Sequence, residues 1–387
     1  MKKAFFLINS LATGGAEKVL SVIINELIKQ EYNVEVIFLE KNEFYKLPKK
    51  VKKIYLSDFT GKESGLKKLL YLPILAWKLR KYIKGNDISL VQSHLYRANY
   101  VNILTKIFGS KHKAQIVNAG VVSRYKDEGL LGKINLFLIK ILYPKSDLII
   151  WKSKGMQYDA EKLFNFNTKQ IVINNPFDLK QIKSLADEKV RDFEFKENKI
   201  YIVSVGRLVE LKRNKDLIKT VSLLSNNIEV IFLGDGEEKE NLIKLAKKLG
   251  VNNRVHFLGQ VKNPYKYIKK CHLFVHTSET EGFPNVIVEA LACGIPVISS
   301  DCISGPREIL YPSSDITKQL RKEDNFELGD YGILYPVGNT QALKNAIEYL
   351  LNNKDVYKKY KQKSIERAKD FSVERIIEEY KRVLLNE

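Results

Sequence analysis

Short apolar runs alternate with amphipathic helical patterns along this chain, and this alternation occurs twice. The first series predicts strands at residues 4–8, 34–39, 89–92, 115–118, 147–151 and 170–174. Such bounded runs are typical of buried parallel strands. A helical pattern such as 16–29, apolar on one face from Val19 to Leu27, lies between successive runs. Strand–helix–strand repetition predicts a doubly wound α/β sheet.

The pattern restarts after a break at Asn175-Pro176 and a charged stretch at 187–199. The second series predicts strands at 201–205, 228–233, 255–258, 273–276, 296–299 and 332–335, with helices such as 237–249 and 285–292. At 387 residues the chain has room for two domains of ordinary size. We therefore expect an α/β protein of two Rossmann-like domains facing a central cleft, with its chemistry in the loops that follow the strands.

The expected domain limits follow from the same pattern. Residues 1–178 form the first Rossmann-like domain and residues 179–365 the second. A lysine-rich helical stretch at 354–385 closes the chain. Residues 366–387 are expected to form a C-terminal helix that returns to the first domain. The run after Met1 stops at Asn9, which is shorter than a secretory signal requires, so we interpret it as the first strand.

Composition limits the function classes. Hydrophobic residues at 44% and charged residues at 28% are typical of a globular protein. Three cysteines cannot form a disulfide framework, and no apolar run approaches the roughly 18 residues of a transmembrane helix. The net charge is +20, and residues 1–178 contain 30 Lys and Arg against 15 Asp and Glu. This excess favours an anionic partner. Nucleic acid is one alternative, but no basic recognition helix or aromatic-basic motif supports it.

Two loops carry residue types suited to phosphate and sugar chemistry. Gly206 follows a predicted strand, and Arg207 and Lys212 follow in the same loop, where a guanidinium and an ammonium suit a diphosphate. These two residues are alternatively solvated surface cations. The second loop runs from Glu281 through Phe283, Pro284 and Asn285 into a helix that contains Glu289. Pro284 suits the first turn of that helix, and the helix start favours an anion. An acidic helix start explains Glu281 without a ligand, but it does not explain Glu289 within an apolar helix.

Further strand-to-helix turns complete a recognisable set of motifs. They are Gly234-Asp235-Gly236, Ala292-Cys293-Gly294-Ile295-Pro296-Val297 and Ser304-Gly305-Pro306-Arg307-Glu308. Together with the Gly-Arg…Lys pair and the Glu-x7-Glu element, in this order, they resemble the GT4 family of retaining glycosyltransferases. The resemblance covers essentially the whole chain and implies the GT-B fold.

The resemblance also implies roles for particular residues. Arg207 and Lys212 would hold the donor diphosphate and stabilise the leaving nucleoside diphosphate. Glu281 would contact the transferred sugar, Glu289 the ribose hydroxyls, and the backbone at 257–260, which includes Gly259, the base. Phe283, Pro284 and Asn285, with Gly206, would line the donor site. Gly14-Gly15-Ala16-Glu17 matches the glycine-rich loop that the family places beside the donor phosphate and the acceptor.

One departure concerns histidine. Many family members carry a histidine where this chain has Asn118-Ala119-Gly120. His94, expected in the loop after the preceding strand, is the candidate to line the cleft in its place; alternatively it is an ordinary loop histidine. His256, His272 and His276 lack metal-ligand spacing, so we expect structural roles for them. No Asp-x-Asp occurs in the chain, and we expect neither a metal nor another cofactor.

Within the family the chain looks most like bacterial enzymes that extend undecaprenyl-diphosphate-linked glycans, which share the segment type at 143–149. The resemblance implies a UDP-sugar donor, N-acetylgalactosamine being one candidate, and a polyprenyl-diphosphate-linked saccharide acceptor, with no nucleic-acid partner. Alternatives are GDP-mannose or a UDP-hexose as donor. An epimerase or phosphorylase of the same fold is a third reading, but the residues that it needs are not recognisable. The polar segment 311–330 has no role that the sequence reveals.

Two segments favour a membrane surface. Residues 66–84 and 130–143 are apolar on one side and basic on the other, as in helices that lie in the headgroup plane of an anionic bilayer. Both could instead be packed helices of the first domain. The basic excess of that domain favours a cytoplasmic protein bound peripherally to the inner face of the cell membrane.

Overall fold

A computed structural model describes residues 2–385, which form two compact units. Among these residues the first unit comprises 2–177 and 373–385, and the second comprises Asp178–Ser372. The change of unit at residue 178 lies where the sequence pattern restarts. The returning segment begins at Val373 rather than at residue 366, because helix α14 (Lys354–Lys369) continues through that position and packs on α11 (Asn285–Ala292) of the second unit.

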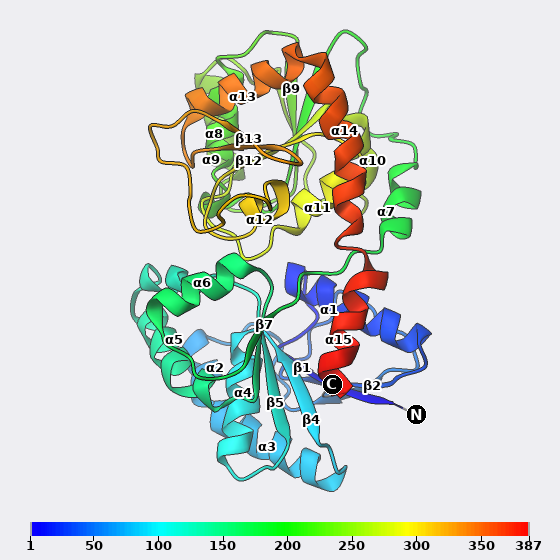
Figure 1. The fold of residues 1–387 in the computed structure, drawn as a ribbon, viewed down its shortest axis with the longest axis vertical. Helices are drawn as coiled ribbons and strands as arrows, with labels where there is room; N and C mark the ends of the chain where they lie inside the picture. The colour runs from blue at the N-terminus through cyan, green and yellow to red at the C-terminus, as the bar shows by residue number, and fades with distance from the viewer. Residues whose placement is uncertain (1, 386–387) are drawn as a thin grey trace. The chain divides into compact units, whose positions relative to one another are not determined.

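The first unit is built on a parallel sheet of seven strands in the order β3-β2-β1-β4-β5-β6-β7 (Figure 1). Its strands are β1 (Lys3–Ile8), β2 (Asn33–Phe38), β3 (Lys52–Tyr55), β4 (Leu90–His94), β5 (Lys113–Asn118), β6 (Leu148–Trp151) and β7 (Gln170–Val172). The central strands are buried on both faces, which explains their continuous apolar runs. Strand β3, at the edge, was not predicted.

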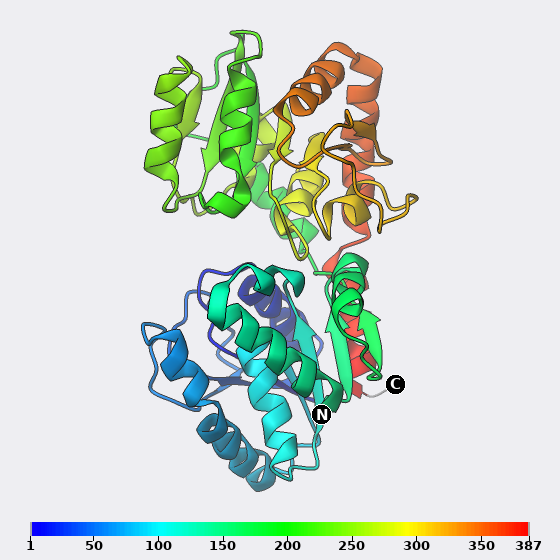
Figure 2. The ribbon, with the colours of Figure 1, turned by 90° about the vertical axis from the view of Figure 1, so that its left-hand side faces the viewer.

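Helices cover both faces of this sheet (Figure 2). The helices are α1 (Gly15–Lys29), α2 (Gly65–Leu70), α3 (Leu72–Gly85), α4 (Tyr96–Ile107), α5 (Gly129–Leu142), α6 (Lys154–Leu163) and α15 (Val373–Leu385). Helices α1 and α15 pack together in the core on one face, whereas α3, α4, α5 and α6 pack in the core on the other. Pro73 stands in the first turn of α3, where its missing N–H costs nothing.

Helix α15 is an integral part of the first unit. The buried Lys152 ammonium donates to the Tyr380 hydroxyl. The Gln115 side chain donates to the Val383 carbonyl at 2.6 Å. Burial lowers the pKa of Lys152 to about 7, against the opposing effect of the Glu379 carboxylate. The C-terminal helix therefore completes the hydrophobic core and the buried polar contacts of this unit.

The second unit repeats the plan, with the strand order β10-β9-β8-β11-β12-β14-β13. Its strands are β8 (Ile200–Val205), β9 (Ile228–Leu233), β10 (Val255–Phe257), β11 (Leu273–His276), β12 (Val297–Ser300), β13 (Glu327–Leu328) and β14 (Ile333–Tyr335). All neighbours are parallel except β13 and β14. Both units therefore have the doubly wound α/β fold that the sequence predicts.

The helices of the second unit also lie on both faces of its sheet (Figure 1). They are α7 (Leu179–Ala186), α8 (Asn214–Val221), α9 (Lys239–Lys248), α10 (Tyr265–Lys270), α11, α12 (Pro306–Leu310), α13 (Thr340–Asn352) and α14. The helical stretch expected at 354–385 is broken between α14 and α15, at 370–372. None of the helices in the described part of the chain is both long enough and apolar enough to span a bilayer.

Candidate active site

Three loops at the carboxyl ends of β8, β9 and β10 are joined by backbone hydrogen bonds. The Leu208 N–H donates to the Asp235 carbonyl at 2.9 Å, and the Gly234 N–H donates to the Gly259 carbonyl at 2.8 Å. Gly234 has a φ of +148°, and a Cβ there would lie 1.9 Å from the Gly206 carbonyl oxygen. Glycine at position 234 thus permits the close approach that places Arg207 beside its neighbouring loops.

Replacing Gly234 with alanine should disrupt this packing, because the new methyl would overlap the Gly206 backbone. We expect the free energy of unfolding to fall by about 2–3 kcal/mol in a denaturant titration. Gly250→Ala is the matched control: Gly250 also has a positive φ, +68°, but no atom lies within 4 Å of its Cβ position. That control should cost about 1 kcal/mol, and equal losses in the two variants would contradict the packing argument.

The loops after β8 and β11 bring the main charged residues together. The short 3-10 helix η3 (Glu210–Lys212) follows β8, and the segment 277–281 follows β11. The Thr277 hydroxyl donates to the Lys212 carbonyl at 2.6 Å, and the Glu279 N–H donates to the Leu211 carbonyl at 2.9 Å. These bonds place the Lys212 ammonium against the Glu281 carboxylate as an ion pair.

Glu281 is held from two sides. Its Oε1 accepts from the Lys212 ammonium and lies 3.0 Å from His276 Nε2. The side chain of Glu281 is 13% exposed and that of Lys212 is 25% exposed. Burial alone would raise the pKa of Glu281, but the Lys212 charge and the His276 hydrogen bond outweigh it and hold this pKa well below the ordinary value. Glu281 is therefore an ionised carboxylate beside a cation.

Arg207 offers an uncommitted guanidinium close along the chain to this ion pair. Its side chain is exposed, and within residues 2–385 it makes no ion pair or side-chain hydrogen bond. Arg213 is different: it donates to Asp216 at 2.7 Å and to Glu279 at 3.3 Å. Arg207 is thus free to bind an anion, whereas Arg213 is committed to structure.

The start of α11 is fixed by the loop that follows β12. Pro284 is the N-cap residue of α11, one position before the predicted first turn, and Asn285 begins the helix. The Ser304 hydroxyl donates to the Gly282 carbonyl at 2.7 Å, and Phe283 packs edge-to-face on Phe371 at 5.4 Å. This loop leads from the ion pair directly into α11.

Glu289 lies in the second turn of α11 and is buried. Its Oε1 accepts from the Tyr265 hydroxyl at 3.2 Å. The structure thus gives this carboxylate a protein partner, and its predicted contact with ribose stays a prediction. The predicted contact of Gly259 with the base also stays a prediction. In the structure the Gly259 carbonyl accepts from the Gly234 N–H and so joins the loop after β10 to the loop after β9.

Two family models together match the sequence of nearly the whole chain. The model described as "Glycosyltransferase Family 4" matches residues 13–181, and the model described as "Glycosyl transferases group 1" matches residues 186–369. A Campylobacter jejuni N-acetylgalactosamine-N,N'-diacetylbacillosaminyl-diphospho-undecaprenol 4-alpha-N-acetylgalactosaminyltransferase is 32% identical over 389 residues, covering 100% of both chains. The chain belongs to glycosyltransferase family 4.

Two further proteins resemble this glycosyltransferase. A second Campylobacter jejuni enzyme, a GalNAc-alpha-(1->4)-GalNAc-alpha-(1->3)-diNAcBac-PP-undecaprenol alpha-1,4-N-acetyl-D-galactosaminyltransferase, is 27% identical over 99% of this chain and 98% of its own. Anabaena HepE, solved in complex with UDP, superposes with a TM-score of 0.74 at 21% identity over 100% of both chains. The expected GT-B fold and the family assignment are confirmed.

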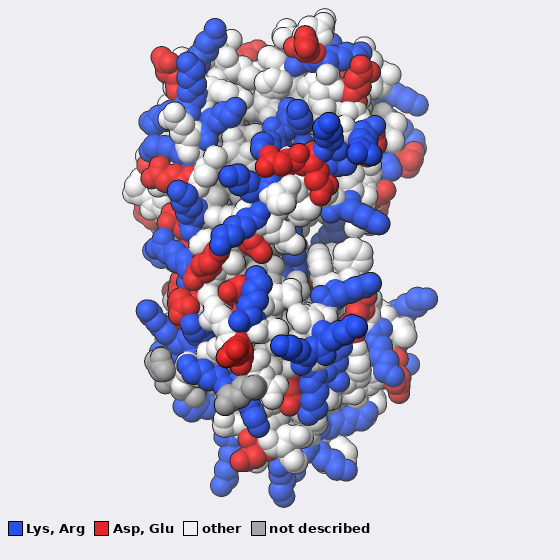
Figure 3. All heavy atoms as spheres, turned by 90° about the vertical axis from the view of Figure 1, so that its right-hand side faces the viewer, with Lys and Arg blue, Asp and Glu red and all other residues white. Residues whose placement is uncertain are grey.

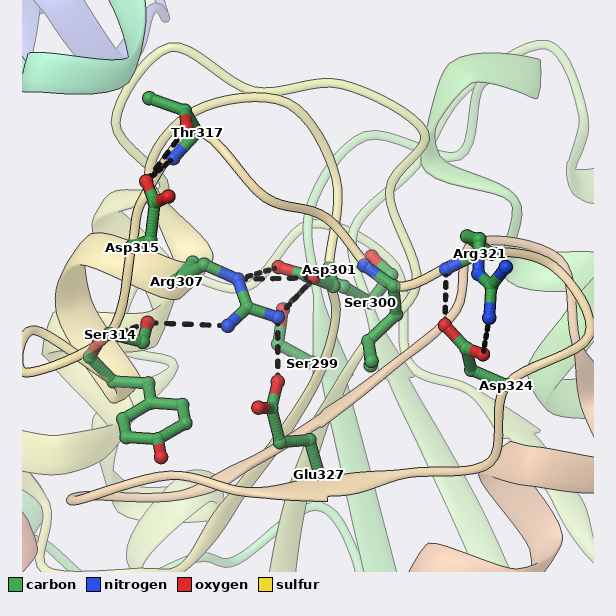
Figure 4. Close-up of polar contacts among 12 residues, drawn as sticks. Ser299, Ser300, Asp301, Arg307, Ser314, Asp315, Thr317, Arg321, Asp324 and Glu327 are labelled. Carbon is green, nitrogen blue, oxygen red and sulfur yellow. Dashed lines mark hydrogen bonds and ion pairs between the residues drawn. The ribbon is translucent and has the colours of Figure 1, made fainter.

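A buried arginine orders the segment 311–330 of this glycosyltransferase (Figure 4). The Arg307 guanidinium donates to Asp301 at 2.6 Å, to Glu327 at 2.7 Å and to the Ser314 hydroxyl at 3.2 Å. Asp301 also accepts from the Leu320 N–H at 2.8 Å. The Arg307 of the Ser-Gly-Pro-Arg-Glu turn therefore holds this polar segment onto the end of β12, which the sequence did not reveal.

The remaining predicted residues lie in the first unit. Gly14 is the N-cap of α1 and Gly15 is its first residue. The Glu17 carboxylate lies against Gly14, since a Cβ there would be 2.0 Å from Glu17 Oε2. The predicted contact of this loop with the donor phosphate and the acceptor stays a prediction. His94 is the buried last residue of β4 rather than a loop residue, with its Nε2 3.1 Å from Gln92 Oε1. Burial, and then the Lys152 charge, hold the pKa of His94 well below its ordinary value. Its catalytic role stays a prediction.

A cavity of about 610 Å³ also lies in the first unit, between α15, the amino ends of β5 and β6, and the edge strand β7. None of the predicted site residues lines this cavity. On β5 and β6 it lies at the opposite end from the carboxyl edge where ligands of open α/β sheets bind.

The residue that sequence reasoning missed is His276. His256 pairs with Glu229 at 2.8 Å, and His272 accepts from the Tyr201 N–H at 3.1 Å, so both make structural contacts. His276 instead touches Glu281, five residues later in the chain. The sequence feature that could have identified His276 was its position at the carboxyl end of the predicted strand 273–276, where ligands of open α/β sheets bind. Within residues 2–385, no group of three or more His, Cys, Asp or Glu side chains is arranged to hold a metal ion.

Proposed function

We propose that this glycosyltransferase transfers N-acetylhexosamine, such as N-acetylgalactosamine, from a UDP-sugar to a saccharide carried on polyprenyl diphosphate. The observation that carries the proposal is the match over 100% of both chains to the Campylobacter jejuni enzyme, whose name states such an acceptor and such a sugar. The UDP in the HepE structure supports the nucleotide.

The residues of the second unit fit a donor site of this kind. Arg207 and Lys212 would bind the diphosphate and stabilise the negative charge that develops on it as the sugar leaves, with no metal required. Glu281 would accept a hydrogen bond from a sugar hydroxyl. The bond from the sugar C1 to the phosphate oxygen breaks, and a bond from C1 to the acceptor oxygen forms on the same face. Because the new bond forms on the face that the diphosphate leaves, the anomeric configuration is retained. The acceptor proton passes to the leaving diphosphate.

A nucleotide panel tests the donor. UDP-N-acetylgalactosamine, UDP-glucose, GDP-mannose and an ADP-sugar, each with its diphosphate, would be added separately to the purified chain. A ligand that binds only the folded state raises its stability by mass action, so UDP compounds at about 100 times Kd should raise the Tm by roughly 5 °C. A shift with GDP compounds only would replace the proposed nucleotide. A shift with none of them, with or without acceptor lipid, would contradict the donor site.

The proposal includes binding to the surface of an anionic membrane. Leu70 of α2 is 71% exposed, and Ile74 and Trp77 of α3 are 46% and 57% exposed. Leu130 and Phe137 of α5 are 74% and 61% exposed. Helices α2 and α5 are neighbours, since a Cβ on Gly65 of α2 would lie 3.6 Å from the Leu131 side chain of α5. We call these exposed apolar residues of α2, α3 and α5 the apolar surface.

Basic residues accompany the apolar surface. Lys67, Lys81, Lys133 and Lys140 are exposed on the same helices, with the Lys81 ammonium 5.9 Å from the centre of the Trp77 ring. On the face drawn in Figure 3, Lys and Arg side chains are spread widely, with Asp and Glu among them. An apolar surface bordered by lysines suits the headgroup region of an anionic bilayer.

Charge placed on the apolar surface should prevent this binding. The double variant Leu130→Glu with Phe137→Glu should bind phosphatidylglycerol vesicles at least about tenfold more weakly than the unchanged protein in a sedimentation assay, because two side chains lose apolar burial. Leu223→Glu is the control, since Leu223 is 49% exposed in the second unit. Equal vesicle binding by all three proteins would show that α5 does not contact the bilayer.

A further inference from the structure

We infer that His276 is a positioning residue that fixes Oε1 of Glu281 and leaves Oε2 for the transferred sugar. This inference rests on the proposed function. In this inference His276 does not touch the substrate, but it sets the orientation of Glu281, which would. Its basis is the arrangement of His276, Ser299, Lys212 and Glu281 at the carboxyl end of β11.

Both nitrogens of the imidazole lie next to a polar side chain, and the Ser299 hydroxyl also lies 3.0 Å from the Ser300 carbonyl. His276 Nδ1 lies 3.0 Å from the Ser299 hydroxyl on β12, and Nε2 lies 3.0 Å from Glu281 Oε1. His276 is 4% exposed and Ser299 is 0% exposed, so the ring cannot turn toward water. A carboxylate can only accept, so the proton must be on Nε2. Burial keeps the pKa of His276 below its ordinary value despite Glu281, which favours this neutral ring at pH 7.

Two donors meet on the same oxygen of Glu281. The Lys212 ammonium and His276 Nε2 both donate to Oε1, whereas Oε2 has no hydrogen-bond partner within residues 2–385. Lysine is a flexible point charge that could follow the carboxylate through several orientations. The buried imidazole has one position, so it is the histidine that determines where Oε2 lies. An ionised, fixed and unshared carboxylate oxygen suits a hydroxyl donor such as a sugar OH.

This arrangement predicts a selective effect on the sugar part of the donor. His276→Phe keeps an aromatic ring but removes the hydrogen bond, so affinity for UDP-N-acetylgalactosamine should fall about tenfold by calorimetry. Affinity for UDP should change less than about twofold, because the diphosphate contacts remain. His276→Gln retains an N–H donor and should restore most of the lost affinity. His272→Phe, at the other end of β11, is the matched control.

The outcomes separate this inference from the proposed function. Equal losses of UDP and UDP-sugar affinity in His276→Phe, or equal impairment in His276→Gln, would overturn the positioning role while leaving the donor site standing. If the unchanged protein binds neither UDP compound, the proposed function fails. A thermal-unfolding cycle of His276→Phe and Glu281→Ala then still tests the contact: non-additive losses in Tm support it, and additive losses overturn it.

Discussion

Lys212→Ala is expected to lower the rate of sugar transfer by about 10²–10³-fold, since it removes the cation that we propose stabilises the charge developing on the leaving diphosphate. The variant also deprives Glu281 of its ion-pair partner. The pKa of Glu281 should therefore rise toward its ordinary value, although the His276 hydrogen bond remains. The thermal stabilisation by UDP should be lost together with turnover. Both are measured on the same purified protein, with a UDP-sugar and a polyprenyl-diphosphate-linked saccharide.

Lys215→Ala is the control for this variant. Lys215 lies three positions further along, is 38% exposed, and pairs only loosely with the exposed Glu210 at 3.6 Å. Removing it should leave turnover and the UDP-induced shift within about twofold, as is usual for a surface ion pair. Normal turnover in Lys212→Ala would exclude Lys212 from the reaction. Equal loss of turnover in the two variants would mean that the effect comes from the loss of surface charge in general and not from Lys212 itself.

The fold was predictable because its signals are local. Strands β9 and β11 and helix α11 have the bounds that the sequence pattern predicts. Apolar runs bounded by turn residues determine such elements without distant contacts. The strands that were missed, β3 and β13, lack this signal. β3 has the sequence KKIY at a sheet edge, and β13 is two residues held by antiparallel pairing with β14. Their strand conformation depends on a neighbouring strand that periodicity does not reveal.

The site was predictable only in part, for a related reason. Arg207, Lys212 and Glu281 could be proposed as site residues because they belong to motifs with a fixed order along the chain, and the structure brings Lys212 and Glu281 into contact. The contact of His276 with Glu281 arises from the turn at 277–281, whose course depends on hydrogen bonds to η3. The role of Arg307 likewise depends on Asp301, directly after β12, and on Glu327 of β13, which both contact it. Side-chain contacts of this kind follow from loop packing, which residue spacing alone does not specify.

Glu281→Gln should lower turnover about 10²–10³-fold while keeping the shape of the side chain, because the ionised oxygen that we assign to the sugar is lost. The matched control is Glu279→Gln, two residues earlier, where the carboxylate is 54% exposed and pairs with Arg213 at 3.3 Å. That control should keep its turnover within about twofold. Full activity in Glu281→Gln would contradict both the donor-site assignment and the role given to His276.

The same variant should change how stability depends on pH, which gives a test without any substrate. The pKa of Glu281 is held well below its ordinary value in the folded chain, so the unfolded chain binds this proton at a higher pH. The stabilisation from Glu281 is therefore fully present above the ordinary carboxyl pKa, about 4.3. It is lost as the pH falls from there toward the lower folded value. Glu281→Gln has no such proton to bind, so its Tm should fall less steeply than that of the unchanged protein below about pH 4.5. Parallel curves for the two proteins would mean that the Lys212–Glu281–His276 cluster does not stabilise the ionised carboxylate.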